Sequence, residues 1–139
     1  MKDIGLKKVS QGNVFNFTHS PFDSILMLMN GIGLCKNIVG LNVFFKKIKK
    51  LLAKGGRIIL DSSDIRYMFE DEDGIFEVDL NASYYGEVQY KMQYDNILGE
   101  EFDWLFVDFD TLKFYAETNG FTCKKIMDGP HYDFLAEIS

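Results

Sequence analysis

The stretch FDSILMLMNGIG, residues 22–33, decides the fold. Its first eight residues form a short and nearly continuous apolar run, which ends at Asn30-Gly31. A run of this kind, without polar alternation, is typical of a strand that is buried on both faces in a parallel sheet. We therefore predict a strand over residues 22–29, followed by a loop over residues 31–38.

A helix is expected after this loop, because apolar residues recur there at steps of three and four. They are Leu41, Phe44, Phe45, Ile48, Leu51 and Leu52, with lysines on the other face. Gly55-Gly56 is expected to end the helix, with Lys54 in its last turn. The apolar stretch RIILD, residues 57–61, then predicts a second strand. Strand, helix and strand in this order predict a parallel βαβ unit.

The second half of the chain has a different pattern. Residues 65–76 are expected to form a short helix or loop, with the acidic run Glu70–Asp73 exposed to solvent, and residues 96–99 are expected to form a turn. Residues 87–94 alternate between apolar and polar, which predicts a strand with one solvated face, and residues 102–107 are its expected return strand. A helix is expected over residues 110–118, capped near Asp108 or Asp110 and ended by Asn119-Gly120. Residues 121–127 and 132–138 are expected to form a last antiparallel pair.

Composition limits the class of protein. A chain of 139 residues is enough for one domain, residues 1–139, and 47% hydrophobic residues with 26% charged residues are ordinary for a globular protein. The net charge of −6 argues against a nucleic-acid-binding module. No apolar stretch is long enough to cross a membrane, and the first residues do not resemble a signal peptide, so we expect a cytoplasmic location. Cys35 and Cys123 are isolated, which argues against a disulfide scaffold or a metal site.

The order of elements resembles the class I S-adenosylmethionine-dependent methyltransferases. FDSILMLMNGIG resembles the family's fourth strand and the loop after it, and LLAKGGRIILD resembles the junction before its fifth strand. The end of the chain, from Asn119-Gly120-Phe121 onward, resembles the closing β-hairpin. NGIG and DSSD suggest a subgroup of bacterial methyltransferases. The resemblance implies an α/β fold, a partial Rossmann-like sheet of parallel strands with a C-terminal antiparallel hairpin.

The resemblance also shows what is missing. The family opens with a strand and a glycine-rich loop for the cofactor, followed by a strand that ends in a ribose-binding carboxylate, and the segment before Phe22 is too short for both. Residues 8–14 resemble instead the family's third strand and its turn. The chain therefore resembles the C-terminal half to two-thirds of a methyltransferase, as a shortened protein, a gene remnant or a proteolytic core. We expect weak or absent S-adenosylmethionine binding by this chain alone.

Residues at the carboxyl ends of the expected strands are the candidates for binding, because ligands of open α/β sheets lie there. The resemblance implies cofactor contacts from Asn13, Val14, Asn30, Gly31 and Ile32, with Asn13 where the family often has an aspartate near the adenine. Asp61 and Ser62 are candidate substrate-binding residues. No catalytic residue is assigned, since methyl transfer needs positioning more than acid–base groups.

Structural alternatives stand beside these assignments. Asn30 is equally well explained as a turn residue, Gly31 and Gly33 as backbone requirements, and Asp61 and Asp64 as strand-end or cap carboxylates. His19 and His131 are expected in turns rather than in catalysis. An aromatic group around residues 84–106 is explained either by a substrate pocket or by the packed face of a hairpin.

Two functions follow from these observations. The first is a methyltransferase that acts on an unidentified acceptor. The second is a non-catalytic, methyltransferase-like module for oligomerisation or interaction. In both cases the strand over residues 22–29 would expose an unpaired edge, so we expect a homodimer through that edge.

Overall fold

The computed structural model describes residues 5–73, 75–76 and 82–139. In chain order, the elements are β1 (Phe22–Met27), the short 3₁₀ helix η2 (Gly31–Cys35), α1 (Ile38–Ile48), β2 (Leu52–Ser63), the 3₁₀ helix η3 (Arg66–Phe69), β3 (Glu87–Tyr94), β4 (Ile97–Leu105), α2 (Phe109–Thr118), β5 (Cys123–Asp128) and β6 (Asp133–Ile138).

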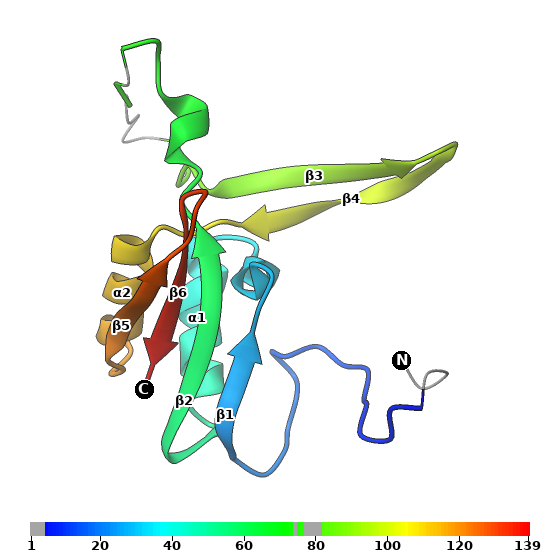
Figure 1. The fold of residues 1–139 in the computed structure, drawn as a ribbon. Coiled ribbons are helices and arrows are strands. Elements are labelled where there is room, and N and C mark those ends of the chain that lie inside the picture. Colours follow the sequence, from blue (N-terminus) through cyan, green and yellow to red (C-terminus); the bar gives the residue numbers. More distant parts are fainter. Residues whose placement is uncertain (1–4, 74, 77–81) are drawn as a thin grey trace.

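The main sheet has four strands in the order β1-β2-β6-β5 (Figure 1). β1 and β2 are parallel, with Met27 opposite Leu60. β6 lies between β2 and β5 and is antiparallel to both. The expected α/β class, the parallel βαβ unit and the closing antiparallel pair are therefore confirmed.

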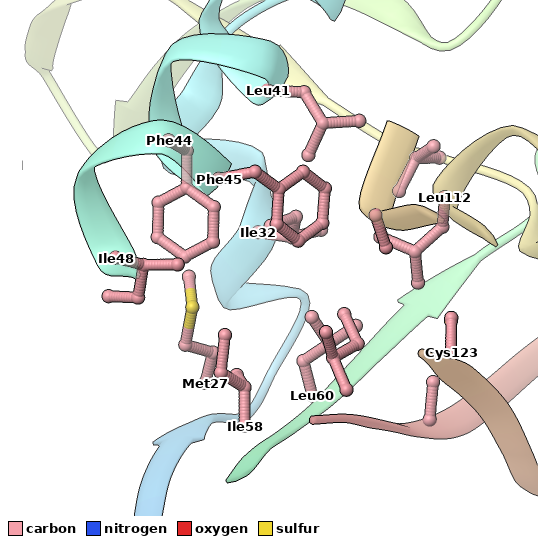
Figure 2. Close-up of a cluster of buried hydrophobic side chains, with 14 of the residues drawn as sticks. Met27, Ile32, Leu41, Phe44, Phe45, Ile48, Ile58, Leu60, Leu112 and Cys123 are labelled. Carbon is pink, nitrogen blue, oxygen red and sulfur yellow. The ribbon is translucent and has the colours of Figure 1, made fainter. Parts of the chain in front are cut away.

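Both long helices pack on the same face of this sheet (Figures 1 and 2). The buried face of α1 is the one that the periodicity predicted: Leu41, Phe44, Phe45 and Ile48. From α2, Leu112 and Ala116 join the same core. This one-sided layer holds the carboxyl ends of β1 and β2 in fixed positions.

The predicted end of the first helix was wrong. α1 ends at Ile48, and Gly55-Gly56 lies inside β2 rather than after the helix. Gly55 has a positive φ of 76°, and a β-carbon on Gly56 would lie 2.9 Å from the Phe22 carbonyl oxygen. The two glycines therefore allow a distortion of β2 where β1 begins, and the pairing register shifts between Phe22 and Ser24. Lys54 is a strand residue of β2 and not part of the last turn of the helix.

Two further expectations were wrong: the burial of the first strand on both faces, and a strand over residues 8–14. β1 is not buried on both faces, since Leu26 is 66% exposed, and Leu28, just past its end, is 52% exposed. β1 is an edge strand, and the helices cover only the opposite face. Residues 8–14 form no strand, and Figure 1 shows the N-terminal segment leading away from β1.

The strands β3 and β4 form the expected hairpin, which projects away from the main sheet (Figure 1). Its turn is at Asp95-Asn96, slightly earlier than predicted, with Asp95 at a φ of 51°. Glu70–Asp73 is exposed, as the sequence indicated. Residues 65–76 were expected to form a short helix or loop. The short helix η3 occupies the first part of this segment, and position 74 lies outside the described residues.

Candidate functional site

The carboxyl ends of the adjacent parallel strands β1 and β2 bring Asn30 and Asp61 together. The Asn30 backbone N–H donates to Asp61 Oδ2 at 3.2 Å. Asn30 Oδ1 and Asp61 Oδ1 are both buried and have no hydrogen-bond partner among the described residues. A buried polar atom without a partner costs stability, so two neighbouring ones at this edge of the sheet indicate a place where a ligand group is expected.

The backbone at this point is strained. Met29 has a φ of 61° and Asn30 a φ of 53°, so two consecutive non-glycine residues are left-handed. Asparagine tolerates this region, whereas a methionine there costs about 1–2 kcal/mol. Strain of this kind collects at binding sites. Here it turns the chain sharply out of β1 and into η2, which leaves the Met29 side chain 90% exposed.

The base of the β3–β4 hairpin is fastened to the same loop. The Asn30 side-chain N–H₂ group donates to the Leu105 carbonyl at 3.4 Å. The Ile38 N–H donates to Glu87 Oε1 at 2.9 Å. Trp104 lies so close to Gly33 that a β-carbon on Gly33 would overlap its indole ring. Gly33 therefore serves the docking of the hairpin, a contact that the sequence pattern did not predict.

Ser62 and Ile32 lie behind this site rather than on its surface. Ser62 is fully buried, and its Oγ accepts a hydrogen bond from the Val107 N–H at 3.1 Å. The Ile32 side chain is fully buried in the core (Figure 2). Gly31 is half-buried, and a β-carbon there would be 3.4 Å from Met27 Cβ. The binding roles expected of these three residues stay predictions.

Asn13 and Val14 lie in a separate hollow. Residues 12–15 line a groove of about 750 Å³ together with the segment from Leu34 to Val43. Asn13 Oδ1 accepts from the Phe15 N–H at 2.9 Å, so the amide is held in place by its own turn. The groove is next to the η2 loop that begins after Asn30. The cofactor residues expected from the sequence therefore form two groups, Asn13 and Val14 in this groove, and Asn30, Gly31 and Ile32 at the start of η2.

A second hollow lies between the hairpin and the end of β1. It has a volume of about 380 Å³ and is lined by Met29, Asn30, Tyr90, Met92, Phe102, Trp104 and Phe106. The aromatic residues were expected in a substrate pocket or in the packed face of a hairpin. Trp104 packs against Gly33, as expected of the packed face of a hairpin, whereas Tyr90 and Phe102 keep a substantial exposed surface, and the substrate pocket stays a prediction.

A tyrosine–aspartate cluster lies beyond the end of β2. The Tyr84 hydroxyl donates to Asp108 Oδ2 at 2.6 Å and accepts from the Asp108 N–H at 2.9 Å. The Tyr85 hydroxyl lies 2.7 Å from Asp64 Oδ1 and 3.2 Å from Asp108 Oδ2. Asp108 Oδ1 also caps α2 by accepting from the Thr111 N–H at 2.9 Å. The cap was predicted, but the tyrosines were not, because their partners are distant in sequence.

This cluster shifts the pKa values of its members. Burial tends to raise the pKa of Asp108, but the hydrogen bonds from Tyr84, Thr111 and Tyr85 outweigh it, and the net pKa is lowered. Burial raises the pKa of Tyr84 and of Tyr85 above the ordinary value for tyrosine. The cluster thus holds a carboxylate ionised and two phenols neutral, which suits a structural lock at the start of α2.

The cysteines and histidines form no reactive site among the described residues. Cys35 and Cys123 are buried, and burial raises their pKa values to about 12 and about 11, so both thiols are inert. His19 is exposed and stacks on Phe22, and His131 is exposed next to the final turn. No group of three metal-binding side chains is found in the described part of the chain. None of the helices described is long and apolar enough to cross a membrane.

Solved structures give a clear comparison. A SAM-dependent methyltransferase from Bacteroides fragilis, in complex with S-adenosyl-L-homocysteine, is 48% identical with a TM-score of 0.89, and the match covers 100% of this chain and 56% of that protein. A S-adenosylmethionine-dependent methyltransferase from Clostridium acetobutylicum is 14% identical, with a TM-score of 0.66 and coverage of 99% and 67%. The sugar N-methyltransferase KedS8 from Streptoalloteichus is 11% identical, with a TM-score of 0.60 and coverage of 99% and 64%. No family model and no curated protein matches the chain.

The last two structures share the fold, and the first shares sequence as well. The chain belongs to the class I S-adenosylmethionine-dependent methyltransferases, whose cofactor is S-adenosylmethionine. It spans just over half the length of the Bacteroides fragilis protein. The resemblance expected from FDSILMLMNGIG and LLAKGGRIILD is thereby confirmed.

Proposed function

We propose that the chain takes part in S-adenosylmethionine-dependent methyl transfer to an acceptor that is not yet identified. The observation that carries this proposal is the pair of buried, unpartnered oxygens of Asn30 and Asp61 at the carboxyl ends of β1 and β2. In an open α/β sheet, ligands bind at this edge. The 48% identity to a methyltransferase crystallised with S-adenosyl-L-homocysteine supports the assignment.

The residues fit parts of a cofactor site. Asn13 and Val14 line a groove large enough for a small molecule, and the exposed Asn13 amide offers hydrogen bonds to a purine edge. Asn30 and Asp61 offer oxygens toward the ligand edge of the sheet, with Ser62 holding the Val107 backbone behind them. The bound cofactor would supply an electrophilic methyl group. The chain's own residues would orient the reactants, which is what this displacement requires.

Nuclear magnetic resonance of the 139-residue chain tests the proposal. S-adenosyl-L-homocysteine, added up to millimolar concentration, should shift the backbone amides of residues 12–15 and 30–37, and the affinity should be weak. Gly31→Leu should reduce these shifts, because a large side chain would enter the strand-end loop next to Met27. Lys113→Leu, at an exposed position of α2 outside both groups of residues, is the control and should leave the shifts unchanged. Shifts confined to other residues, or none, would contradict the proposal.

We also propose the second function, a homodimerising module, because β1 leaves one edge unpaired within the described chain. Unpaired edges with exposed apolar side chains favour pairing with another strand. Leu26 and Leu28 extend this apolar surface next to the edge. The net charge of −6 supports a protein rather than a nucleic acid as partner. The cytoplasmic location stays a prediction.

Sedimentation tests this second function. Met27 is buried in the core, so Met27→Asp should unfold the chain and says little about the edge. Leu26→Lys places a charge on exposed surface and should turn a dimer into a folded monomer. Val39→Lys, on the exposed side of α1, is the matched control and should stay dimeric. A folded monomer of the unchanged chain at micromolar concentration would contradict the dimer.

A further inference from the structure

The β3–β4 hairpin carries two chemically different faces. Residues that alternate along β3, Val88, Tyr90 and Met92, share one face, and the pairing puts Trp104 and Phe102 opposite the first two. The other face carries charged and polar pairs such as Lys91 with Glu101. Because strand side chains alternate, the apolar face is continuous over the base of the hairpin, as far as the shift in pairing register between Lys91 and Gln93.

The apolar face is closed into a groove only at the base of the hairpin. There, Met29 and Asn30 at the end of β1 complete its wall. The volume of about 380 Å³ is within the range of small-molecule sites. Farther out, Tyr94 and Ile97 extend the apolar face but lie outside the groove.

None of the groove's lining residues carries a charge, and its floor has the Asn30 amide as a polar group. Tyr90 packs against Phe102 and Phe106, with ring centres 5.9 Å and 6.2 Å apart, so these rings form a continuous aromatic wall of the groove. By contrast, the hollow beside β5 and β6 is lined by five aspartates, Arg66 and Lys125. Unlike that charged hollow, the groove at the hairpin base favours an uncharged, apolar occupant.

The position of the groove links it to the proposed reaction. Asn30 belongs both to its lining and to the pair with Asp61 at the carboxyl ends of the parallel strands. An occupant of the groove would therefore lie at the ligand edge of the sheet. The groove of residues 12–15 shares no lining residue with the groove at the hairpin base, so the two hollows would take different molecules or different parts of one.

We propose that the groove at the base of the β3–β4 hairpin binds the uncharged aromatic or apolar body of the methyl acceptor. This inference rests on the proposed function, and it adds the chemical class of the acceptor. Apolar surface and ring stacking supply the binding energy, and the Asn30 amide orients the molecule.

Tryptophan fluorescence tests the proposal directly, because Trp104 is the sole tryptophan of the chain and lines the groove. Nitrobenzene is an uncharged aromatic quencher and serves as the probe. Its quenching of the folded chain should saturate, which indicates a bound complex. Nitrobenzoate, the charged analogue, should quench only in proportion to its concentration. Linear quenching by both compounds, or equal saturation by both, would overturn the proposal.

Two substitutions on the same face locate the site. Met92→Glu puts a charge into the groove at a position that is already 66% exposed, and it should weaken nitrobenzene binding by about tenfold or more. Tyr94→Glu places the same charge two residues farther along the hairpin, outside the groove, and should leave binding unchanged. Equal weakening by both would show binding to the hairpin face in general and overturn the groove. Circular dichroism checks that both variants are folded.

The cofactor experiment separates this inference from the proposed function. Amide shifts with S-adenosyl-L-homocysteine, together with unsaturated nitrobenzene quenching, would overturn the groove and leave the proposed function standing. Saturable quenching without any shifts by S-adenosyl-L-homocysteine would overturn the proposed function, and with it the identification of the occupant as a methyl acceptor.

Discussion

The indole of Trp104 lies directly against the backbone of Gly33, at a distance that leaves no room for a side chain at position 33. This contact fixes the base of the β3–β4 hairpin on the loop that follows β1. Asn30 strengthens the same junction through its bond to the Leu105 carbonyl. The hairpin is therefore docked beside the ligand edge of the sheet, although its outer part projects away from it (Figure 1).

Gly33→Ala should destabilise this junction. The added methyl group overlaps the Trp104 ring, so the hairpin base must move, and such overpacking costs about 1–3 kcal/mol of unfolding free energy. Urea unfolding followed by Trp104 fluorescence measures the loss. Gly12→Ala is the control, because the nearest atom to its β-carbon would be 3.9 Å away. An unchanged midpoint for Gly33→Ala would show that the hairpin is not held by this contact.

Tyr84→Phe should weaken the lock at the start of α2. It removes the donor to Asp108 Oδ2 and leaves the Asp108 N–H without its acceptor, so we expect a loss of about 1–3 kcal/mol. Tyr132→Phe changes a tyrosine that is 66% exposed and serves as the control. Chemical unfolding of both variants measures the difference. Equal stability would mean that the hydroxyl contributes nothing.

The raised tyrosine pKa values predict a loss of stability at alkaline pH. Below the ordinary tyrosine pKa of about 10, Tyr84 and Tyr85 are protonated in both the folded and the unfolded chain. Above it, they ionise in the unfolded chain but stay neutral in the folded chain, because burial raises their pKa values. The unfolding free energy should therefore fall as the pH rises above about 10. Urea unfolding at a series of pH values measures the slope, which should be smaller in Tyr84→Phe; an identical slope would contradict the assignment.

Local patterns were enough to predict most of the fold. The periodicity around Phe44 and Phe45 identified the buried face of α1, and the alternation over residues 87–94 identified the hairpin. The end of α1 was missed, because Gly55-Gly56 is equally compatible with a helix stop and with a strand distortion. The distortion depends on the close approach of the Phe22 carbonyl, which is a tertiary contact.

The candidate site was predictable only in part. The rule that ligands lie at strand ends led to Asn30 and Asp61, and the structure brings these two together. The rule could not show that Ser62 is buried, because neighbouring residues in a strand point to opposite faces. It could not show that Ile32 is buried either, because the short helix η2 that turns Ile32 into the core was not predicted. The Tyr84–Asp108 contact and the Gly33–Trp104 contact join segments that lie far apart in sequence, and no local pattern indicates either.

Asp61→Asn should make the chain more stable and, at the same time, weaken its binding of S-adenosyl-L-homocysteine. Asparagine keeps an oxygen to accept from the Asn30 N–H, and it replaces a buried carboxylate oxygen that has no partner in the described structure. A neutral amide costs less to bury than a carboxylate, so the change should raise the unfolding free energy by about 1 kcal/mol. If that oxygen is held ready for a ligand, the same change should weaken the amide shifts that S-adenosyl-L-homocysteine causes around residue 30. Asp23→Asn, on exposed β1 surface, should change neither quantity. A variant that is less stable than the unchanged chain would show that Asp61 supports the fold rather than a ligand.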